Sequence, residues 1–172
     1  ILEKIAPQGK VLGIEADKDL YQNHKFQRLI VINDNFVNLK KIIEKENFTD
    51  IAGILLDLGL SSWHLEESKR GFSFQKNEPL NMRLNEWQDD LTASEIVNHW
   101  PEKGIEKILR EYSQEKFSGN IAKAICEARK TKIIRTTFQL VEIVKRAMPR
   151  NYEKGRIHPA TRIFLALRIA VN

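Results

Sequence analysis

Three short apolar runs in the first third of the chain each end in a polar side chain that can bind a ligand. The side chains are Glu15, Asn35 and Asp57. A carboxylate such as Glu15 can accept two hydrogen bonds from a ribose diol, and Asp57 could accept them from the exocyclic amino group of a base. Acidic and amide side chains also end strands and cap the helices that follow. The three positions therefore predict either a ligand crevice or ordinary helix caps.

The runs themselves, residues 11–14, 29–32 and 51–56, are typical of parallel strands buried on both faces, which indicates the α/β fold class. After the second run, apolar residues recur at helical spacing and predict an amphipathic helix over 36–47. The carboxyl ends of parallel strands open on a shared crevice. Phe36 lies just beyond the second strand, where it either offers a flat face to an adenine ring or packs in the core of its own helix.

The rest of the chain changes to a long loop followed by helical patterns. Residues 61–85 contain several aromatic side chains without a clean period, which predicts an ordered loop packed by its own aromatics. Capping boxes at 92–95 and 136–139 predict two helix starts. Pro159 stands at a first-turn position and predicts a last helix with one apolar face. Residues 66–157 are therefore interpreted as a mostly helical insertion.

The net charge of +5 is unevenly distributed along the chain. Residues 1–102 carry 12 basic and 17 acidic side chains, whereas residues 103–172 carry 16 basic and 6 acidic ones, a local net charge of +10. Neutralisation of phosphates with release of counterions is the main sequence-independent source of affinity for nucleic acids. The basic part therefore predicts either a polyanionic partner or an ordinary solvated helical surface.

The composition excludes or disfavours several classes of protein. Cys126 is the only cysteine, so no intrachain disulfide can form and a reduced, cytoplasmic setting is expected. The longest apolar stretches are far shorter than the roughly 20 residues that a membrane span needs. The four histidines lack metal-ligand spacing, so no metal site is expected, and the sequence contains no glycine-rich G-x-G or Walker loop.

Four long segments of the sequence resemble one known family. They are GILLDLGLSS at 53–62, RGFSF at 70–74, PLNMR at 79–83 and HPATRIFLALRIAVN at 158–172. Their order, with YSQEKF and IAKAI between the third and the fourth, is similar to that of the bacterial 16S ribosomal RNA cytosine-N4 methyltransferases, the RsmH or MraW family. The resemblance covers essentially the whole chain.

The resemblance implies a class I, Rossmann-like doubly wound sheet that uses S-adenosyl-L-methionine, with an inserted all-helical domain that helps to hold RNA. Residues 1–65 and 158–172 would form the methyltransferase domain, and residues 66–157 the insertion. The implied reaction is methyl transfer to the exocyclic N4 of one cytidine in the decoding region of the small-subunit ribosomal RNA. The implied partner is that RNA or the assembling 30S subunit, and either a monomer or an oligomer is compatible with it.

The resemblance also implies site residues by motif position. Glu15 would bind the ribose of the cofactor, Phe36 would lie near its adenine, and Asp57 and His64 would follow the fourth strand. Asp57 is in addition the candidate catalytic residue, a hydrogen-bond acceptor near N4 of the cytidine. The candidate RNA-binding residues are Arg83, Arg162 and Arg168.

Four positions depart from the family pattern. Glu15 replaces an aspartate, His64 replaces a glutamine and adds pH sensitivity, and Asn81 and Asn85 replace aspartates. The family's glycine-rich cofactor loop is expected before residue 1 and its last strands after residue 172, so the chain is expected to be part of a longer enzyme. The alternative functions are a non-catalytic RNA-binding fragment and a structural remnant with neither activity.

Overall fold

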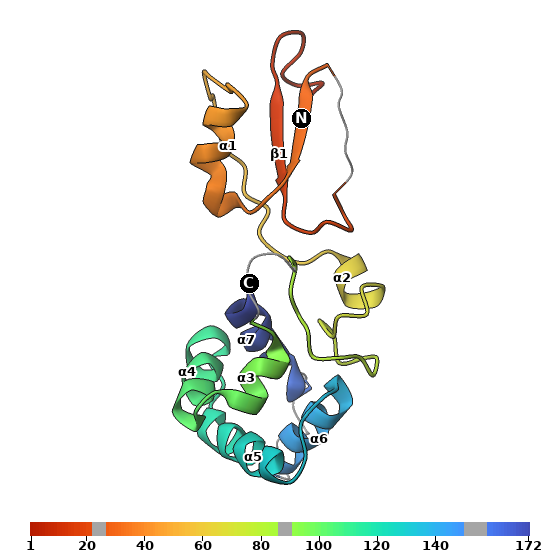
Figure 1. Ribbon diagram of the computed structural model, residues 1–172, viewed down its shortest axis with the longest axis vertical. Helices are drawn as coiled ribbons and strands as arrows, with labels where there is room; N and C mark the ends of the chain where they lie inside the picture. Colours follow the sequence, from red (N-terminus) through yellow and green to blue (C-terminus); the bar gives the residue numbers. More distant parts are fainter. Residues whose placement is uncertain (22–26, 86–90, 150–157) are drawn as a thin grey trace. The chain divides into compact units, whose positions relative to one another are not determined.

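The computed structural model describes residues 1–21, 27–85, 91–149 and 158–172. Their contacts divide them into two compact units. The first is built on Ile1–Leu58, and the second on Gly59–Arg83 together with the described part of Asp89–Asn172. The first unit contains a small sheet with one α-helix, and the second is a set of helices joined by loops (Figure 1).

Two parallel strands form the sheet of the first unit. β1 (Val11–Glu15) pairs with β2 (Leu29–Asn33) in a register that sets Glu15 opposite Asn33 at the carboxyl ends. After β2 the chain forms the short 3-10 helix η1 (Phe36–Asn38) and then α1 (Leu39–Lys45). The first two predicted strands and the predicted helix are therefore confirmed, within a residue or two at their ends.

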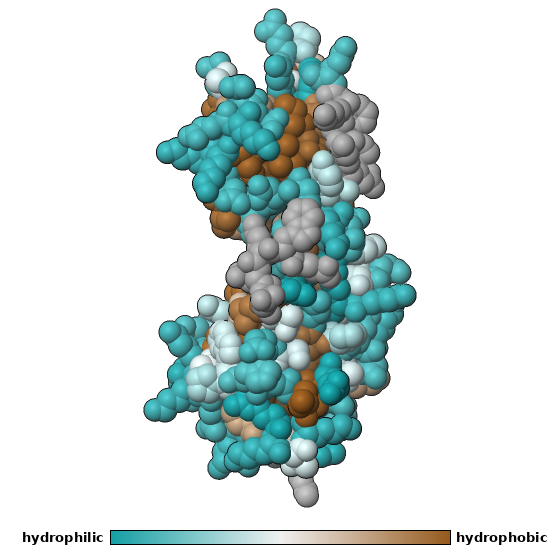
Figure 2. All heavy atoms as spheres, viewed as in Figure 1, coloured by the Kyte–Doolittle hydropathy of each residue, from teal (hydrophilic) through white to brown (hydrophobic). Residues whose placement is uncertain are grey.

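The sheet of the first unit is only partly covered by other residues. Every residue of both strands is partly exposed, and Figure 2 shows apolar surface of this unit open to solvent between hydrophilic side chains. Parallel sheets normally bury both faces under helices. Within the described residues, this sheet therefore keeps apolar surface in contact with water.

The prediction of a third strand at residues 51–56 is wrong. This stretch is irregular chain with no strand partner among the described residues, and Ile54 and Leu55 are 64% and 78% exposed. A strand needs a neighbour to satisfy its backbone donors and acceptors, and in the described part of the chain β1 and β2 pair only with each other. An apolar run indicates that its side chains favour burial, but it does not specify which strand would pair with it.

The second unit contains six helices within the described residues, and α3 to α7 surround one apolar core. They are α2 (Ser62–Glu66), α3 (Ala93–His99), α4 (Glu102–Ser113), α5 (Ser118–Thr131), α6 (Thr137–Ala147) and α7 (Ala160–Val171). α4 packs against both α5 and α7, and α5 packs against α6. The large, fully buried side chains of this core include Ile105, Leu109, Ile121, Leu140 and Phe164.

The loop that follows α2 is ordered by burial of its own apolar side chains. Phe72, Leu80 and Met82 are at most 1% exposed, and Phe74 stacks on His158 with their ring centroids 4.8 Å apart. The predicted aromatic loop is therefore confirmed, except that its first residues form α2.

The predicted helix starts at α3 and α6 are both confirmed. Thr136 and Gln139 form a complete capping box at α6, in which each side chain accepts a hydrogen bond from the other residue's backbone. At α3, Thr92 Oγ1 accepts the backbone N–H of Glu95 at 3.0 Å. The Glu95 carboxylate lies 2.8 Å from His99 Nδ1, one helical turn away.

The last helix, α7, belongs to the helical unit, where it packs against α3, α4 and α6. The sequence grouped residues 158–172 with residues 1–65 as one domain. In the structure, the apolar face of α7 that includes Ile163 and Leu167 is buried in the helical core, and the domain bounds taken from the sequence stay a prediction. Residue 157, the predicted end of the insertion, lies outside the described residues.

Gly71 provides a test of how the aromatic loop is packed. It has φ of +75°, and an added Cβ would lie 2.1 Å from the carbonyl oxygen of Pro79. We expect Gly71→Ala to lower the free energy of unfolding by at least about 2 kcal/mol, because the left-handed backbone and the clash both oppose a side chain. Urea denaturation followed by circular dichroism measures this change.

Gly104→Ala is the matched control, because Gly104 lies in the first turn of α4. Its Cβ would meet the side chains of Pro101 and Trp100 at 3.5 and 3.6 Å, which are ordinary contacts. Alanine favours a helix over glycine by roughly 0.5–1 kcal/mol, so this variant should be at least as stable as the wild type. Equal stability of the two variants would contradict the described packing of Gly71.

Candidate functional site

The carboxyl edge of the sheet brings Glu15 and Asn33 side by side. The two residues are paired in register, and Asn33 Nδ2 donates to the backbone oxygen of Glu15 at 2.8 Å. Glu15 Oε1 accepts the backbone N–H of Asp17 at 2.8 Å, which holds the carboxylate at this edge. No described residue donates a hydrogen bond to Glu15 Oε2, so this second oxygen is open to a ligand.

Asp34 continues the polar edge beyond β2. Its backbone N–H donates to the backbone oxygen of Glu15 at 3.2 Å, and its Oδ1 accepts Asn38 Nδ2 at 2.8 Å. The next residue, Asn35, caps η1, since its Oδ1 accepts the backbone N–H of Val37 at 3.0 Å. Of the two interpretations offered by the sequence, a helix cap therefore describes Asn35, whereas Glu15 keeps an oxygen for a ligand.

Phe36 begins η1 directly after this edge. Its side chain is 49% exposed, so it is not a core residue of its own helix. Two residues before Phe36, the backbone N–H of Asp34 donates to the backbone oxygen of Glu15. This bond ties the start of η1 to the end of β1. A carboxylate oxygen and an exposed aromatic face near one sheet edge suit a nucleoside, because the acid can accept from the ribose diol and the ring can cover the base.

Asp57 lies in the irregular stretch after α1 and is exposed. The sequence argument placed it at the end of a buried strand, where its carboxylate would need hydrogen-bond donors. Exposure removes that requirement, because water solvates the charge. No hydrogen bond among the described residues joins Asp57 to Glu15 or Phe36. The roles of Asp57 in catalysis and cofactor binding thus stay predictions.

His64 belongs to the second unit, where it caps the start of α2. Its Nδ1 accepts the backbone N–H of Ser61 at 3.1 Å and lies 2.8 Å from Ser61 Oγ. Because a backbone N–H is always the donor, the neutral ring carries its proton on Nε2. The residue is 4% exposed, and its ring meets Trp63 and Phe72 edge-on. Its role at the cofactor stays a prediction, and its Nδ1 is already used by the helix cap.

Two of the arginines predicted to bind RNA hold the aromatic loop together. Arg83 Nε donates to Asn81 Oδ1 at 3.0 Å, so the amide at position 81 still serves as an acceptor. Arg168 Nη1, from α7, donates to the backbone oxygen of Phe72 at 3.0 Å. Burial lowers the pKa of the Arg168 guanidinium from its ordinary value. Binding of RNA by these two side chains stays a prediction, and their intramolecular bonds alone account for their positions.

Sequence reasoning missed Glu115, a carboxylate buried between α4 and α5. It is 1% exposed, and its Oε1 accepts the backbone N–H of Phe117 at 2.9 Å. Its Oε2 has no hydrogen-bond partner in the described part of the chain, but Arg162 Nη1 lies 3.9 Å away and supplies the opposing charge. The signal in the sequence is the segment YSQEKF, although its composition does not reveal that the acid is buried.

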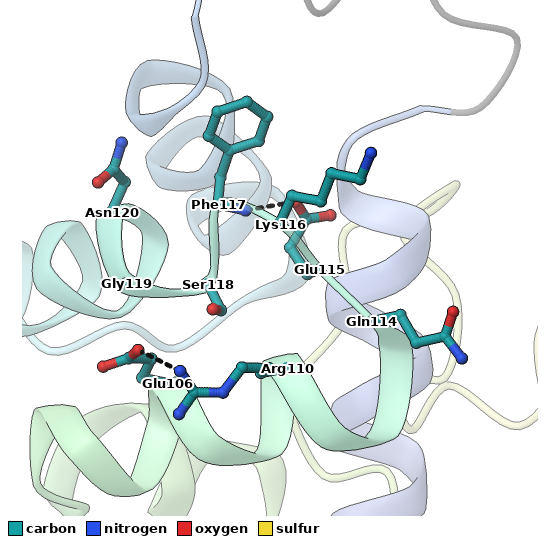
Figure 3. A pocket seen from close by; sticks show the side chains of 9 residues that line it. All are labelled: Glu106, Arg110, Gln114, Glu115, Lys116, Phe117, Ser118, Gly119 and Asn120. Atoms are coloured by element: carbon teal, nitrogen blue, oxygen red, sulfur yellow. Dashed lines mark hydrogen bonds and ion pairs between the residues drawn. The ribbon is translucent and has the colours of Figure 1, made fainter.

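An open groove lies between α4 and α5, beside Glu115 (Figure 3). Arg110 and Lys116 line it together with the Phe117 ring, and Arg110 is paired with Glu106 at 3.0 Å. The lining mixes both charges with an apolar ring. It contains no nucleophile paired with a base, so it has no arrangement of the kind that covalent catalysis uses.

The parts of the chain that the structure describes contain no candidate metal site and no candidate membrane-spanning helix. Across these residues, no three His, Cys, Asp or Glu side chains are grouped so that they could hold a metal ion. None of their helices is long and apolar enough to cross a membrane.

Comparison with known proteins identifies the family to which this chain belongs. All of residues 1–172 match the MraW methylase family. The chain therefore belongs to this family, and its α/β architecture with a small parallel sheet agrees with the α/β fold class.

Curated relatives carry a more specific name. The chain is 43% identical over 180 residues to the ribosomal RNA small subunit methyltransferase H of Acetivibrio thermocellus. It is 40% identical over 177 residues to the protein of the same name from Clostridium botulinum strain Kyoto. Each of these alignments covers 100% of the chain and 57% of the relative. The chain thus spans somewhat more than half the length of the curated relatives that it matches.

Arg168→Ala tests whether this side chain holds the aromatic loop. Removing a partly buried hydrogen bond from a charged donor should lower the free energy of unfolding by about 1–2 kcal/mol. It should also speed amide hydrogen exchange in residues 70–83, because the loop loses a support. Arg146→Ala removes the same charge from an exposed position on α6 and should change stability by less than about 0.5 kcal/mol. Equal, small effects of the two substitutions would show that Arg168 does not support the loop.

Proposed function

We propose that this chain takes part in methyl transfer from S-adenosyl-L-methionine to the exocyclic N4 of a cytidine in the decoding region of small-subunit ribosomal RNA. The observation that carries the proposal is the match of all 172 residues to the MraW methylase family. The name shared by the relatives, ribosomal RNA small subunit methyltransferase H, supports the RNA as substrate. The fold proposed for the whole enzyme is the class I, Rossmann-like doubly wound sheet with an inserted helical domain.

The residues at the sheet edge fit the nucleoside part of the cofactor. Glu15 offers Oε2 to the ribose hydroxyls, while its Oε1 is held by the backbone of Asp17. Phe36 offers a half-exposed ring to the adenine. Glutamate in place of the aspartate that is usual in the family reaches one methylene further and keeps two acceptor oxygens. The cofactor, when bound, supplies an electrophilic methyl group on a sulfonium.

The chemistry requires positioning more than a covalent nucleophile. Attack of an amine nitrogen on the methyl carbon is an in-line displacement, so the rate depends on holding the two atoms together in a site without water. The N4 lone pair of cytosine is delocalised into its ring. A carboxylate that accepts a hydrogen bond from the amino group localises this pair and receives the proton that leaves. Asp57 is the proposed acceptor, with the backbone after it as part of the same neighbourhood.

The basic part of the chain is proposed to hold the RNA. Residues 103–172 carry a net charge of +10, and most of them belong to the helical unit. A base inside a stack cannot reach a buried methyl group, so the target cytidine is expected to leave its stack while the protein grips the flanking phosphates. The proposed partner is the free ribosomal RNA or the assembling 30S subunit.

A non-catalytic RNA-binding role is the second candidate. It is favoured by residues 51–58, whose described chain is irregular and exposed, because a catalytic carboxylate needs a rigid support. The two functions differ in one measurement, which is transfer of a tritiated methyl group to small-subunit particles by a protein that carries this chain at the length of its relatives. RNA binding without transfer would favour the second candidate.

Asp57→Asn tests the proposed catalytic acceptor in a protein that carries this chain at the length of its relatives. The amide keeps the size of the side chain but cannot take the proton, so methyl transfer should fall by about 100-fold or more. Binding of the cofactor, measured by equilibrium dialysis, separates a loss of chemistry from a loss of affinity. Asp57→Ala should abolish either cofactor binding or methyl transfer.

Asp50→Asn is the matched control, because Asp50 is an exposed acid seven positions earlier in the chain. It removes the same charge and should leave turnover unchanged. Wild-type turnover of both Asp57 variants would refute the role of Asp57.

A further inference from the structure

Four exposed side chains mark the corner between α5 and α6. They are Lys132, Ile133, Arg135 and Phe138, which we call the α5–α6 edge. Ile133 is 53% exposed and Phe138 is 47% exposed, although the helices on either side bury their apolar faces. This stretch of seven residues thus presents two cations and two apolar side chains to solvent, a combination that makes it a candidate contact surface.

Hydrogen bonds with Asn98 and Leu80 hold the backbone of this edge. Ile134 is 2% exposed, and the Asn98 side chain bonds to both of its backbone groups at 2.9 Å. The backbone oxygen of Arg135 also accepts the N–H of Leu80 at 3.3 Å. These bonds fix the chain between two helices, so the side chains on either side of Ile134 are displayed toward solvent. A surface ordered in advance loses less entropy when it binds.

The charge of the edge is not balanced by acids nearby in the sequence. Residues 123–146 contain seven basic and two acidic side chains. The two acids, Glu127 and Glu142, are paired with Lys130 and Lys145 at 2.7 and 3.4 Å. The side chains of Lys132 and Arg135 have no ion-pair partner among the described residues.

A groove of about 430 Å³ adjoins the edge at Arg135 and is lined by polar side chains that include Thr92 and Thr136. The oxygens of these two hydroxyl groups accept backbone N–H groups at 3.0 and 3.5 Å. Their hydroxyl hydrogens have no acceptor in the described part of the chain. A hydroxyl group in this state can donate to an anionic oxygen. The groove therefore pairs one guanidinium with two hydroxyl donors, which is the chemistry that binds a phosphate.

We propose that the α5–α6 edge and this groove are the surface on which the helical unit binds an unpaired RNA strand. Arg135 and Lys132 neutralise neighbouring phosphates, and Phe138 with Ile133 covers the face of an unstacked base. An unpaired strand fits better than a duplex, because the apolar side chains need a base whose face is free. The proposed function enters only through the choice of RNA as the polyanion.

The surface differs from the one that the sequence indicated. Arg83, Arg162 and Arg168 are tied to Asn81, Glu115 and Phe72 within the fold. The side chains of Lys132 and Arg135 have no such contact among the described residues, so they can meet phosphates and release counterions without breaking one.

The experiment measures binding of the chain to a fluorescein-labelled, unpaired oligoribonucleotide by fluorescence anisotropy over a range of salt concentrations. Replacing Lys132 and Arg135 together by alanine should weaken binding about 10-fold or more and reduce the slope of log K against log salt by about 1.4, or 0.7 for each lost phosphate contact. The matched control replaces Lys103 and Lys107, two exposed lysines of α4, by alanine. It should weaken binding by less than about threefold, because it changes the net charge equally but leaves the edge intact.

Phe138→Ala isolates the apolar part of the surface. It should weaken binding about 10-fold without changing the salt slope, because stacking on a base releases no counterions. Phe138→Trp should keep or improve the affinity. Thermal melts of all variants should match the wild type, since the replaced side chains are exposed.

Three outcomes would overturn the assignment of this surface. The two double variants could lose affinity equally, the edge variant could bind RNA as the wild type does, or polyglutamate could compete as well as unlabelled RNA of equal charge. The last outcome would indicate an acidic protein partner. Binding that is localised to the edge, with no methyl transfer in the assay on small-subunit particles, would contradict the proposed function alone.

Discussion

The hydrogen bonds that α7 donates to the aromatic loop are the interaction on which the helical unit depends most. Arg168 and Asn172 donate to the backbone oxygens of Phe72 and Met82, which lie 96 and 90 positions away in the sequence. A loop without regular structure has no ladder to satisfy its carbonyl groups, so donors from a neighbouring helix determine where it lies. The buried face of α7 anchors these donors, which makes the last helix and the loop one packed body.

This constraint separates the basic side chains into two kinds. Arg168 is an internal donor, and Arg162 faces the buried carboxylate of Glu115. Lys132 and Arg135, in contrast, extend into solvent on either side of Ile134, whose backbone is hydrogen-bonded to the Asn98 side chain. A charge total counts all four equally. Only the second kind is available to a polyanion without loss of an internal contact, which is why the regional surplus of charge does not by itself locate an RNA surface.

The first unit depends on a different constraint, the parallel register of its two strands. This register places Glu15 opposite Asn33, and the hydrogen bonds around the edge use one Glu15 oxygen while leaving the other. Parallel pairing thus converts two residues distant in sequence into one polar edge. The apolar residues after α1 show the limit of the same rule, since without a neighbouring strand among the described residues they stay exposed.

The sequence by itself determined the local structure and the family. Periodicity and capping residues are short-range signals, so β1, β2, the capping boxes and the helical pattern after Pro159 could all be predicted. The tertiary structure decided which side chains are buried. It removed the strand at 51–56, placed His64 in a helix cap, and buried Glu115. These outcomes depend on partners that are distant in the chain, and a residue's type and spacing do not specify such partners.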